Sequence, residues 1–218
     1  MRTPMQWMRV AGFKLFFASF ALGTSYGATV TVFDNFGPGD TFIHNGGQAI
    51  GVIGWLGSLV VKTAAMPFTS GANYTLDRVE LAASLDNGAN ELDVWLTNTV
   101  SGLPGSVLES YHFSGAMGFF ATPNIPILSV NSSLHPLLQA GSQYWLLATS
   151  IQAYAVWNNS TDVGLNVYRF DSDPWTTDDG SVGAFRITAT PVPESSTALS
   201  IFFGLCGISW LGVRKFPL

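Results

Sequence analysis

The sequence predicts an all-β fold, a jelly-roll-like β-sandwich between an N-terminal signal peptide and a single C-terminal hydrophobic helix. Three observations support this fold class. Residues 28–190 contain short runs in which apolar and polar side chains alternate with a period of two, as in half-buried strands. Clusters of Gly, Pro, Asn and Asp separate these runs, and no amphipathic helical pattern interrupts them. The segment has the size of one domain with its own core.

The alternation is clearest in residues 74–81 and 91–96. Asp86-Asn87-Gly88 lies between them, and this turn signal predicts that the two strands form a hairpin. Further strands are expected at 28–34, 58–66, 106–113, 125–130, 143–150, 153–157, 164–170 and 183–188. No repeat of about 20–50 residues is present, which disfavours a solenoid or a propeller.

The N-terminus has the pattern of an export signal. Its basic start contains Arg2, Arg9 and Lys14. An apolar run over 15–23 follows, and the small residues Ser25 and Gly27 stand at positions −3 and −1 of a cut before Ala28. The apolar run is too short for a stable membrane anchor. We therefore expect residues 1–27 to direct Sec-type export and to be removed by signal peptidase.

The C-terminal tail, 191–218, contains an uncharged apolar stretch over 198–213. As a helix it would be about 24 Å long, somewhat less than the roughly 30 Å hydrocarbon core of a bilayer. Arg214 and Lys215 can snorkel to the headgroups, and they predict a membrane stop with the C-terminus in the cytoplasm. The alternative is a buried core helix, but such a helix would carry a polar face.

The tail also resembles a known sorting signal. Val192-Pro193-Glu194-Ser195, the apolar stretch and the basic end resemble the PEP-CTERM signal of exopolysaccharide-producing Gram-negative bacteria. Ser195 stands where that family has a second proline. The resemblance implies an exosortase-like protease that acts near the motif, a transient tether to the inner membrane, and delivery to the cell surface or the extracellular matrix. It also makes exopolysaccharide a candidate partner.

The core resembles a second family. Its ordered segments include 33–40, 74–76, 102–109, 134–141 and 184–186, and together they look like the choice-of-anchor R domain. This resemblance covers most of residues 28–188. It implies a bacterial surface module that occurs with different C-terminal anchors and has no assigned activity.

The predicted core is acidic and contains no cysteine, which excludes some classes of function. Without both terminal signals the core keeps thirteen acidic and four basic residues, a net charge of −9. Such a surface argues against binding nucleic acid or anionic membranes, which need clustered Lys and Arg. The sole cysteine, Cys206, lies in the tail, so the exported core has neither disulfide nor thiol chemistry.

No motif for catalysis is present. The sequence lacks Gly-x-Ser-x-Gly, His-Glu-x-x-His and a phosphate-binding glycine loop, and its histidines His44, His112 and His135 are scattered. We therefore expect a protein that is not an enzyme, and that is either purely structural or binds glycan or another matrix component. The alternative is a secreted carbohydrate-active enzyme on the same scaffold, since a pair of catalytic carboxylates leaves no sequence spacing to recognise.

Two candidate binding sites follow from residue chemistry. Asp171, Asp173, Asp178 and Asp179 offer clustered hard oxygen ligands for calcium, although without EF-hand spacing, and the alternative is a solvated acidic loop. A weaker calcium set is the pair Asp34 and Asp40, which flank the opening turn.

Aromatic residues offer the second candidate, a sugar-binding face on which indole rings stack. Trp157 and Trp175 are expected to be exposed, beside Asn158-Asn159 and the acidic segment. Trp95 and Tyr111 are assigned to the core. The glycan hypothesis depends on fold analogy with other jelly rolls.

Overall fold

The structure, a computed structural model, describes residues 27–55 and 58–193. Strands make up 69% of these residues and no helix occurs among them, which confirms the all-β prediction. Within these ranges no helix is long and apolar enough to cross a membrane. Most of the predicted signal peptide, the hydrophobic helix and five predicted site residues lie outside the described residues. The five are Ser25, Glu194, Ser195, Arg214 and Lys215.

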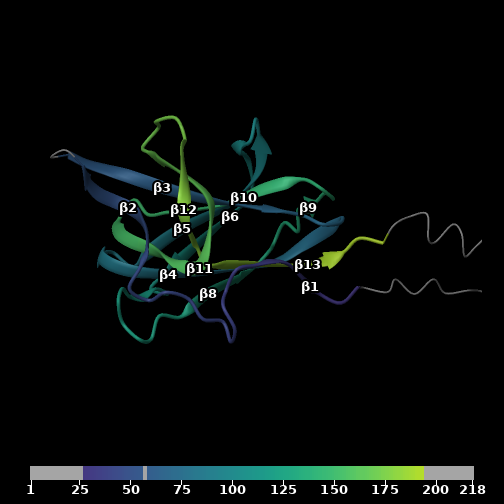
Figure 1. The fold of residues 1–218 in the computed structure, drawn as a ribbon, viewed down its shortest axis with the longest axis horizontal. Coiled ribbons are helices and arrows are strands. Elements are labelled where there is room, and N and C mark those ends of the chain that lie inside the picture. The colour runs from purple at the N-terminus through teal and green to yellow at the C-terminus, as the bar shows by residue number, and fades with distance from the viewer. Residues whose placement is uncertain (1–26, 56–57, 194–218) are drawn as a thin grey trace, which may run out of the picture.

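Thirteen strands are present in the described ranges (Figure 1). In chain order they are β1 (Val30–Asp34), β2 (Gly47–Trp55), β3 (Ser58–Thr69), β4 (Tyr74–Gly88), β5 (Glu91–Val100), β6 (Leu103–Ser114), β7 (Gly118–Phe119), β8 (Ile127–Asn131), β9 (Leu137–Leu138), β10 (Gln143–Thr149), β11 (Ala153–Phe170), β12 (Thr176–Gly183) and β13 (Phe185–Pro191).

Hydrogen bonds join these strands into one open sheet in the order β1-β13-β4-β11-β2-β3-β10-β5-β6. β12 pairs with β11, while β7, β8 and β9 pair with β4. The long strand β4 links two halves of the sheet. Its residues 74–82 pair with β13, β8 and β9, and its residues 83–88 pair with β11. The first half, as we call it, consists of β1, β13, β8, β9 and residues 74–82 of β4. The second half consists of β11, β2, β3, β10, β5 and β6.

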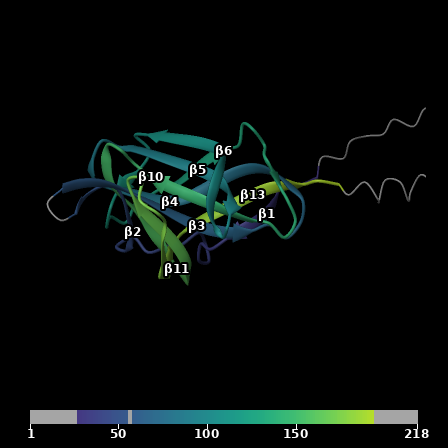
Figure 2. The ribbon, with the colours of Figure 1, turned by 90° about the horizontal axis from the view of Figure 1, so that it is seen from above.

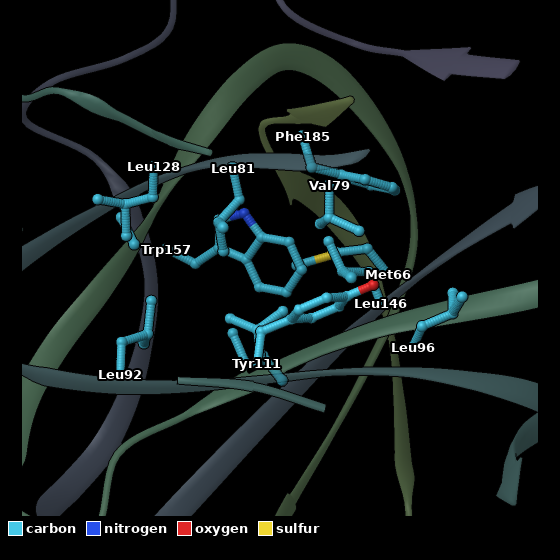
Figure 3. Close-up of a cluster of buried hydrophobic side chains, with 14 of the residues drawn as sticks. Met66, Val79, Leu81, Leu92, Leu96, Tyr111, Leu128, Leu146, Trp157 and Phe185 are labelled. Carbon is cyan, nitrogen blue, oxygen red and sulfur yellow. The ribbon is translucent and has the colours of Figure 1, made fainter. Parts of the chain in front are cut away.

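The two halves bury their inner faces against each other. Leu81 and Phe185 of the first half belong to the same buried cluster as Tyr111, Leu146 and Trp157 of the second half. Figure 3 shows the Trp157 indole in the middle of this group, with Leu81 and Phe185 on one side and Tyr111 on the other. The hydrophobic core therefore lies between the halves of a sheet that folds over itself.

The predicted hairpin between residues 74–81 and 91–96 is wrong. β4 does not pair with β5, which pairs with β6 and β10 instead. The reason is that both edges of β4 are already occupied near its end: Leu85 pairs with Ala155 of β11 and with Phe119 of β7. Gly88, in the predicted turn, is still part of β4 and has a φ of 96°.

Other differences concern strand number. The strands expected at 153–157 and 164–170 form the single strand β11, whose pairing with β12 is irregular between Asn159 and Val163. β2 was not predicted, and β12 occupies the second half of the acidic stretch 171–180. The first part of β11 pairs with β2 and β4, and its last part pairs with β3 and β12.

The two ends of the described chain emerge side by side. β1 and β13 are antiparallel neighbours, with Val30 opposite Ala189. Both lie toward the same end of the molecule in the two perpendicular views of Figures 1 and 2. The predicted cleavage point before Ala28 is therefore close to the start of the predicted sorting tail.

Candidate ligand-binding face

The outer face of the second half is hollowed. The outer hollow, as we call it, has a volume of about 270 Å³, slightly below the roughly 300–1,000 Å³ of typical small-molecule pockets. Its lining residues come from β5, β6, β10, β11 and the turn before β12: Trp95, Thr97, Pro104, Gly105, Val107, Leu147, Arg169 and Trp175.

Strand alternation and register place the floor of this hollow. On β5, Val94 and Leu96 point into the core, so Trp95 and Thr97 point outward. Trp95 is opposite Leu147 of β10, Leu147 is opposite Ala65 of β3, and Ala65 is opposite Val167 of β11. Because Leu147 and Ala65 are shorter than the indole beside them, the sheet surface is low between Trp95 and β11.

Arg169 and Trp175 form the other wall. Arg169 follows Val167 by two residues and therefore faces the same way. Its guanidinium carbon lies 4.6 Å from the centroid of the Trp175 ring, which is within the range of a cation–π interaction. Pairing of Tyr168 with Thr176 brings Trp175 beside Arg169, and Trp175 stays half-buried.

Buried polar atoms around the hollow have no hydrogen-bond partner within the described residues. They are Thr97 Oγ1, Trp145 Nε1 and Arg169 Nε. Thr97 and Trp145 are register partners, and Trp145 packs in one cluster with Leu147, Trp95 and Trp175. Unsatisfied buried donors are costly and rare in native proteins. Indole rings beside a guanidinium suit an oxygen-rich ligand that has apolar ring faces.

The expectation that Trp157 is exposed is wrong. Trp157 is 0% exposed, and its Nε1–H donates a hydrogen bond of 3.1 Å to the backbone oxygen of Ala184. It points into the core because it lies on the inner face of β11, against Phe185. In this structure its ring offers no surface to a sugar.

Trp95 was assigned to the core, and it faces outward into the hollow instead. Tyr111, by contrast, is buried as expected. The sequence contained a signal for Trp95, because Leu92, Val94 and Leu96 occupy the alternate positions of the same strand. No comparable signal marked Arg169.

The four aspartates predicted to bind calcium do not converge. Asp171 Oδ1 accepts a hydrogen bond of 3.0 Å from the backbone N–H of Val61. Asp178 and Asp179 are consecutive in β12 and therefore project to opposite faces. Within residues 27–55 and 58–193, no three His, Cys, Asp or Glu side chains are grouped to hold a metal ion. Calcium binding at Asp171, Asp173, Asp178 and Asp179 stays a prediction.

Asp34 and Asp40 bind an arginine. Arg186 Nε lies 2.8 Å from Asp34 Oδ2, its Nη1 lies 3.2 Å from Glu80 Oε2, and its Nη2 contacts Asp40. Partial burial lowers the pKa of Arg186, but the surrounding carboxylates outweigh this and raise it above its usual value. Arg186 thus holds the opening turn against β13. These contacts bring residues 33–40 next to residues 184–186.

Replacing Arg186 with methionine is expected to lower the free energy of unfolding by about 2–3 kcal/mol, because Asp34 and Asp40 lose their counter-ion and Glu80 loses the nearer of its two. Arg78 is the matched control, since its side chain is 49% exposed and lies 3.9 Å from Glu80. Arg78→Met should cost at most about 1 kcal/mol. Urea unfolding of the full chain in detergent measures both. Equal losses for the two variants would show that the Arg186 contacts add nothing to folding.

A histidine and two carboxylates share the outer face near Trp95. His112 Nδ1 is 2.8 Å from Asp93 Oδ1, and His112 Nε2 is 2.8 Å from Glu91 Oε2. The hydrogen bond with Asp93 is the main cause that raises the pKa of His112 above its usual value of 6.5. The other histidines make ring contacts with backbone oxygens, His44 with Thr122 and His135 with Leu76.

The raised pKa of His112 predicts a pH dependence of stability. Its contribution is fully present below pH 6.5, the unfolded value, and is lost as the pH rises through the higher folded pKa. The unfolding free energy should therefore fall above pH 6.5, and His112→Gln should remove this component. Urea unfolding between pH 5.5 and 8.5, with an NMR titration of the His112 ring, measures both. A ring midpoint below 6.5 would contradict the expected direction.

A second hollow, of about 230 Å³, is lined mainly by apolar side chains such as Phe33, Met66 and Phe185. Its amide, Asn35, already donates to Gly183 and accepts from the N–H of Phe185. The outer hollow, which is lined by two tryptophans and an arginine, is therefore the better candidate site. Searches of protein-family models, curated proteins and solved structures found no match to this chain.

Proposed function

We propose that this chain is an exported, non-enzymatic protein of the cell surface or extracellular matrix of a Gram-negative bacterium, and that it binds glycan through the outer hollow. One observation carries the glycan proposal: Trp95 and Trp175 flank a hollow that Arg169 also lines, with its guanidinium against the Trp175 ring. Aromatic rings supply apolar contact surface, and a few polar groups fix the orientation of a ligand. The folded sheet would then be the jelly-roll-like sandwich that presents this face.

The sequence signals support the export route. Residues 1–27 would engage Sec-type machinery and signal peptidase, and the 191–218 tail would engage an exosortase-like protease. The neighbouring positions of β1 and β13 support this topology, because both membrane segments of the precursor could then enter one bilayer with the domain on its outer side. Exopolysaccharide is the proposed matrix partner.

Glycan binding predicts that Trp175→Ala and Trp95→Ala each weaken affinity about tenfold through loss of ring contacts. Phe119→Ala is the matched control, because Phe119 is 66% exposed and lies outside the hollow. A glycan array probed with the full chain in detergent and with each variant measures the effect. Binding that survives both tryptophan substitutions, or no binding to any glycan, would contradict the proposal.

The sorting proposal is tested by stopping the chain after Pro193. This cut keeps β13 and the hydrogen bond from Val192 N–H to the Asn73 oxygen. We expect a folded product that is exported but released to the medium without retention at the cell surface. Cell fractionation with mass spectrometry of the C-terminus measures this. Identical fractionation of the truncated and full chains would argue against a sorting role for the tail.

The alternative function, a carbohydrate-active enzyme, has one specific observation in its favour. Asp93 lies two residues before Trp95 on the same face of β5, within the Glu91–His112–Asp93 cluster. If this cluster were catalytic, the full chain would release reducing sugar ends from a bound glycan, and Asp93→Asn would abolish that release. Binding without turnover would leave the non-enzymatic proposal standing.

A further inference from the structure

We infer that the outer hollow selects acidic glycans, whose uronate carboxylates bind Arg169. This inference rests on the proposed glycan-binding function and specifies the ligand class for the same site.

The first step compares the partners of the four basic residues in the core. The core has four basic residues against thirteen acidic ones, so carboxylate partners are abundant. Arg186 contacts three carboxylates and Arg78 lies near Glu80. Lys62 lies over the ring of Tyr168 and interacts electrostatically with Asp178. Within the part of the chain that the structure describes, Arg169 makes no ion pair.

The position of Arg169 carries the second step. Arg169 lines the outer hollow, its guanidinium lies against the Trp175 ring, and its buried Nε has no hydrogen-bond partner within the described residues. A guanidinium is a planar fork of donors that matches the two oxygens of a carboxylate, and stacking on an aromatic ring holds the fork in one orientation. A carboxylate is therefore the acceptor that fits Arg169 best.

The surrounding aromatic residues identify the molecule that carries the carboxylate. Trp95 stands on the opposite side of the hollow from Arg169 and Trp175, with Leu147 between them. Ring stacking on indole together with a single cation suits a sugar ring that bears one carboxylate. The net charge of −9 repels polyanions in general, polyuronates included. At physiological salt that repulsion is screened beyond about 8 Å, so the direct contact at Arg169 dominates for a uronate.

The test uses matched pairs of polymers. Polygalacturonate, alginate and hyaluronate are each compared with a carboxyl-reduced derivative, in which every carboxylate is replaced by a hydroxymethyl group. We expect the full chain to bind at least one acidic polymer about tenfold more tightly than its reduced form, as measured by biolayer interferometry in detergent. Arg169→Met should remove this preference, because it keeps an unbranched apolar stem but removes the charged guanidinium. Arg169→Lys should keep only part of the preference, because it lacks the fork.

Arg78→Met, in the first half of the sheet, is the control and should leave the preference unchanged. Circular dichroism confirms the folding of each variant, and binding to neutral polymers provides a second check. Equal binding of acidic and reduced polymers, or a preference that survives Arg169→Met, would overturn the acidic-sugar inference but leave glycan binding intact. No binding to any polymer, neutral or acidic, would instead overturn the proposed function itself.

Discussion

Replacing Trp157 with alanine is expected to lower the free energy of unfolding by about 3–5 kcal/mol, the usual cost of removing a large aromatic side chain from a core. Trp157 is fully buried and lies edge-on to Phe185, with ring centroids 5.9 Å apart. The substitution also removes the hydrogen bond to Ala184. The cavity should stay open, because the inner faces of both halves of the sheet meet at this ring.

Trp175→Ala is the matched control, since it removes the same side chain from a half-buried position on the outer face. Its cost should be about 1 kcal/mol or less. Urea unfolding followed by circular dichroism measures both variants, and Trp157→Phe should recover part of the loss. If Trp157→Ala were as stable as Trp175→Ala, the indole of Trp157 would not be part of the core.

Glu109→Ala is expected to cost about 2–4 kcal/mol, because it leaves several buried donors without an acceptor. Glu109 is 3% exposed on the inner face of β6. Its carboxylate accepts hydrogen bonds of 2.6 Å from Ser132 Oγ, 2.6 Å from the Ser133 N–H and 3.1 Å from the Leu134 N–H. Glu109 therefore holds the segment after β8 against β6.

The same contacts predict an acid-sensitive component of stability. Burial raises the pKa of Glu109, but the hydrogen bonds from Ser132, Ser133 and Leu134 outweigh burial and hold it below its usual value of 4.5. The contribution is present above pH 4.5 and is lost as the pH falls through the folded pKa. The difference in unfolding free energy between wild type and Glu109→Gln should therefore shrink from pH 5 to pH 3. A difference that stays constant over that range would show that the ionised carboxylate is not the stabilising form.

Much of the secondary structure could be predicted because local alternation reports burial. Leu92, Val94 and Leu96 fix the inner face of β5 without any knowledge of its neighbours. The pairing of β4 could not be predicted, because a turn signal at Asp86–Gly88 does not reveal that both edges of the strand are already occupied.

The orientation of Trp157 was not predictable for a different reason. Residues 155–158 are all buried, so this part of β11 shows no alternation from which to assign a face. Nearby asparagines suggested exposure, yet Asn158 is itself 0% exposed and donates to the backbone oxygen of Ile43.

The outer hollow depended on register across several strands. Trp95 and Trp175 are brought to one site by three pairings. β5 pairs with β10, β10 pairs with β3, and β3 pairs with the last part of β11. A single sequence gives no information on that order. The Arg186 contacts also join residues that are far apart in the sequence, since Asp34 precedes Arg186 by 152 residues.

The central claim is that the outer hollow binds glycan, and the most direct test is oxidative footprinting of the tryptophans by mass spectrometry. The full chain is oxidised with and without the polysaccharide that binds best on the array. Trp175 and Trp95 should react in the free protein and be protected by the glycan, whereas Trp157 should stay unreactive in both. Protection that falls elsewhere, with Trp95 and Trp175 equally reactive in both samples, would contradict the account.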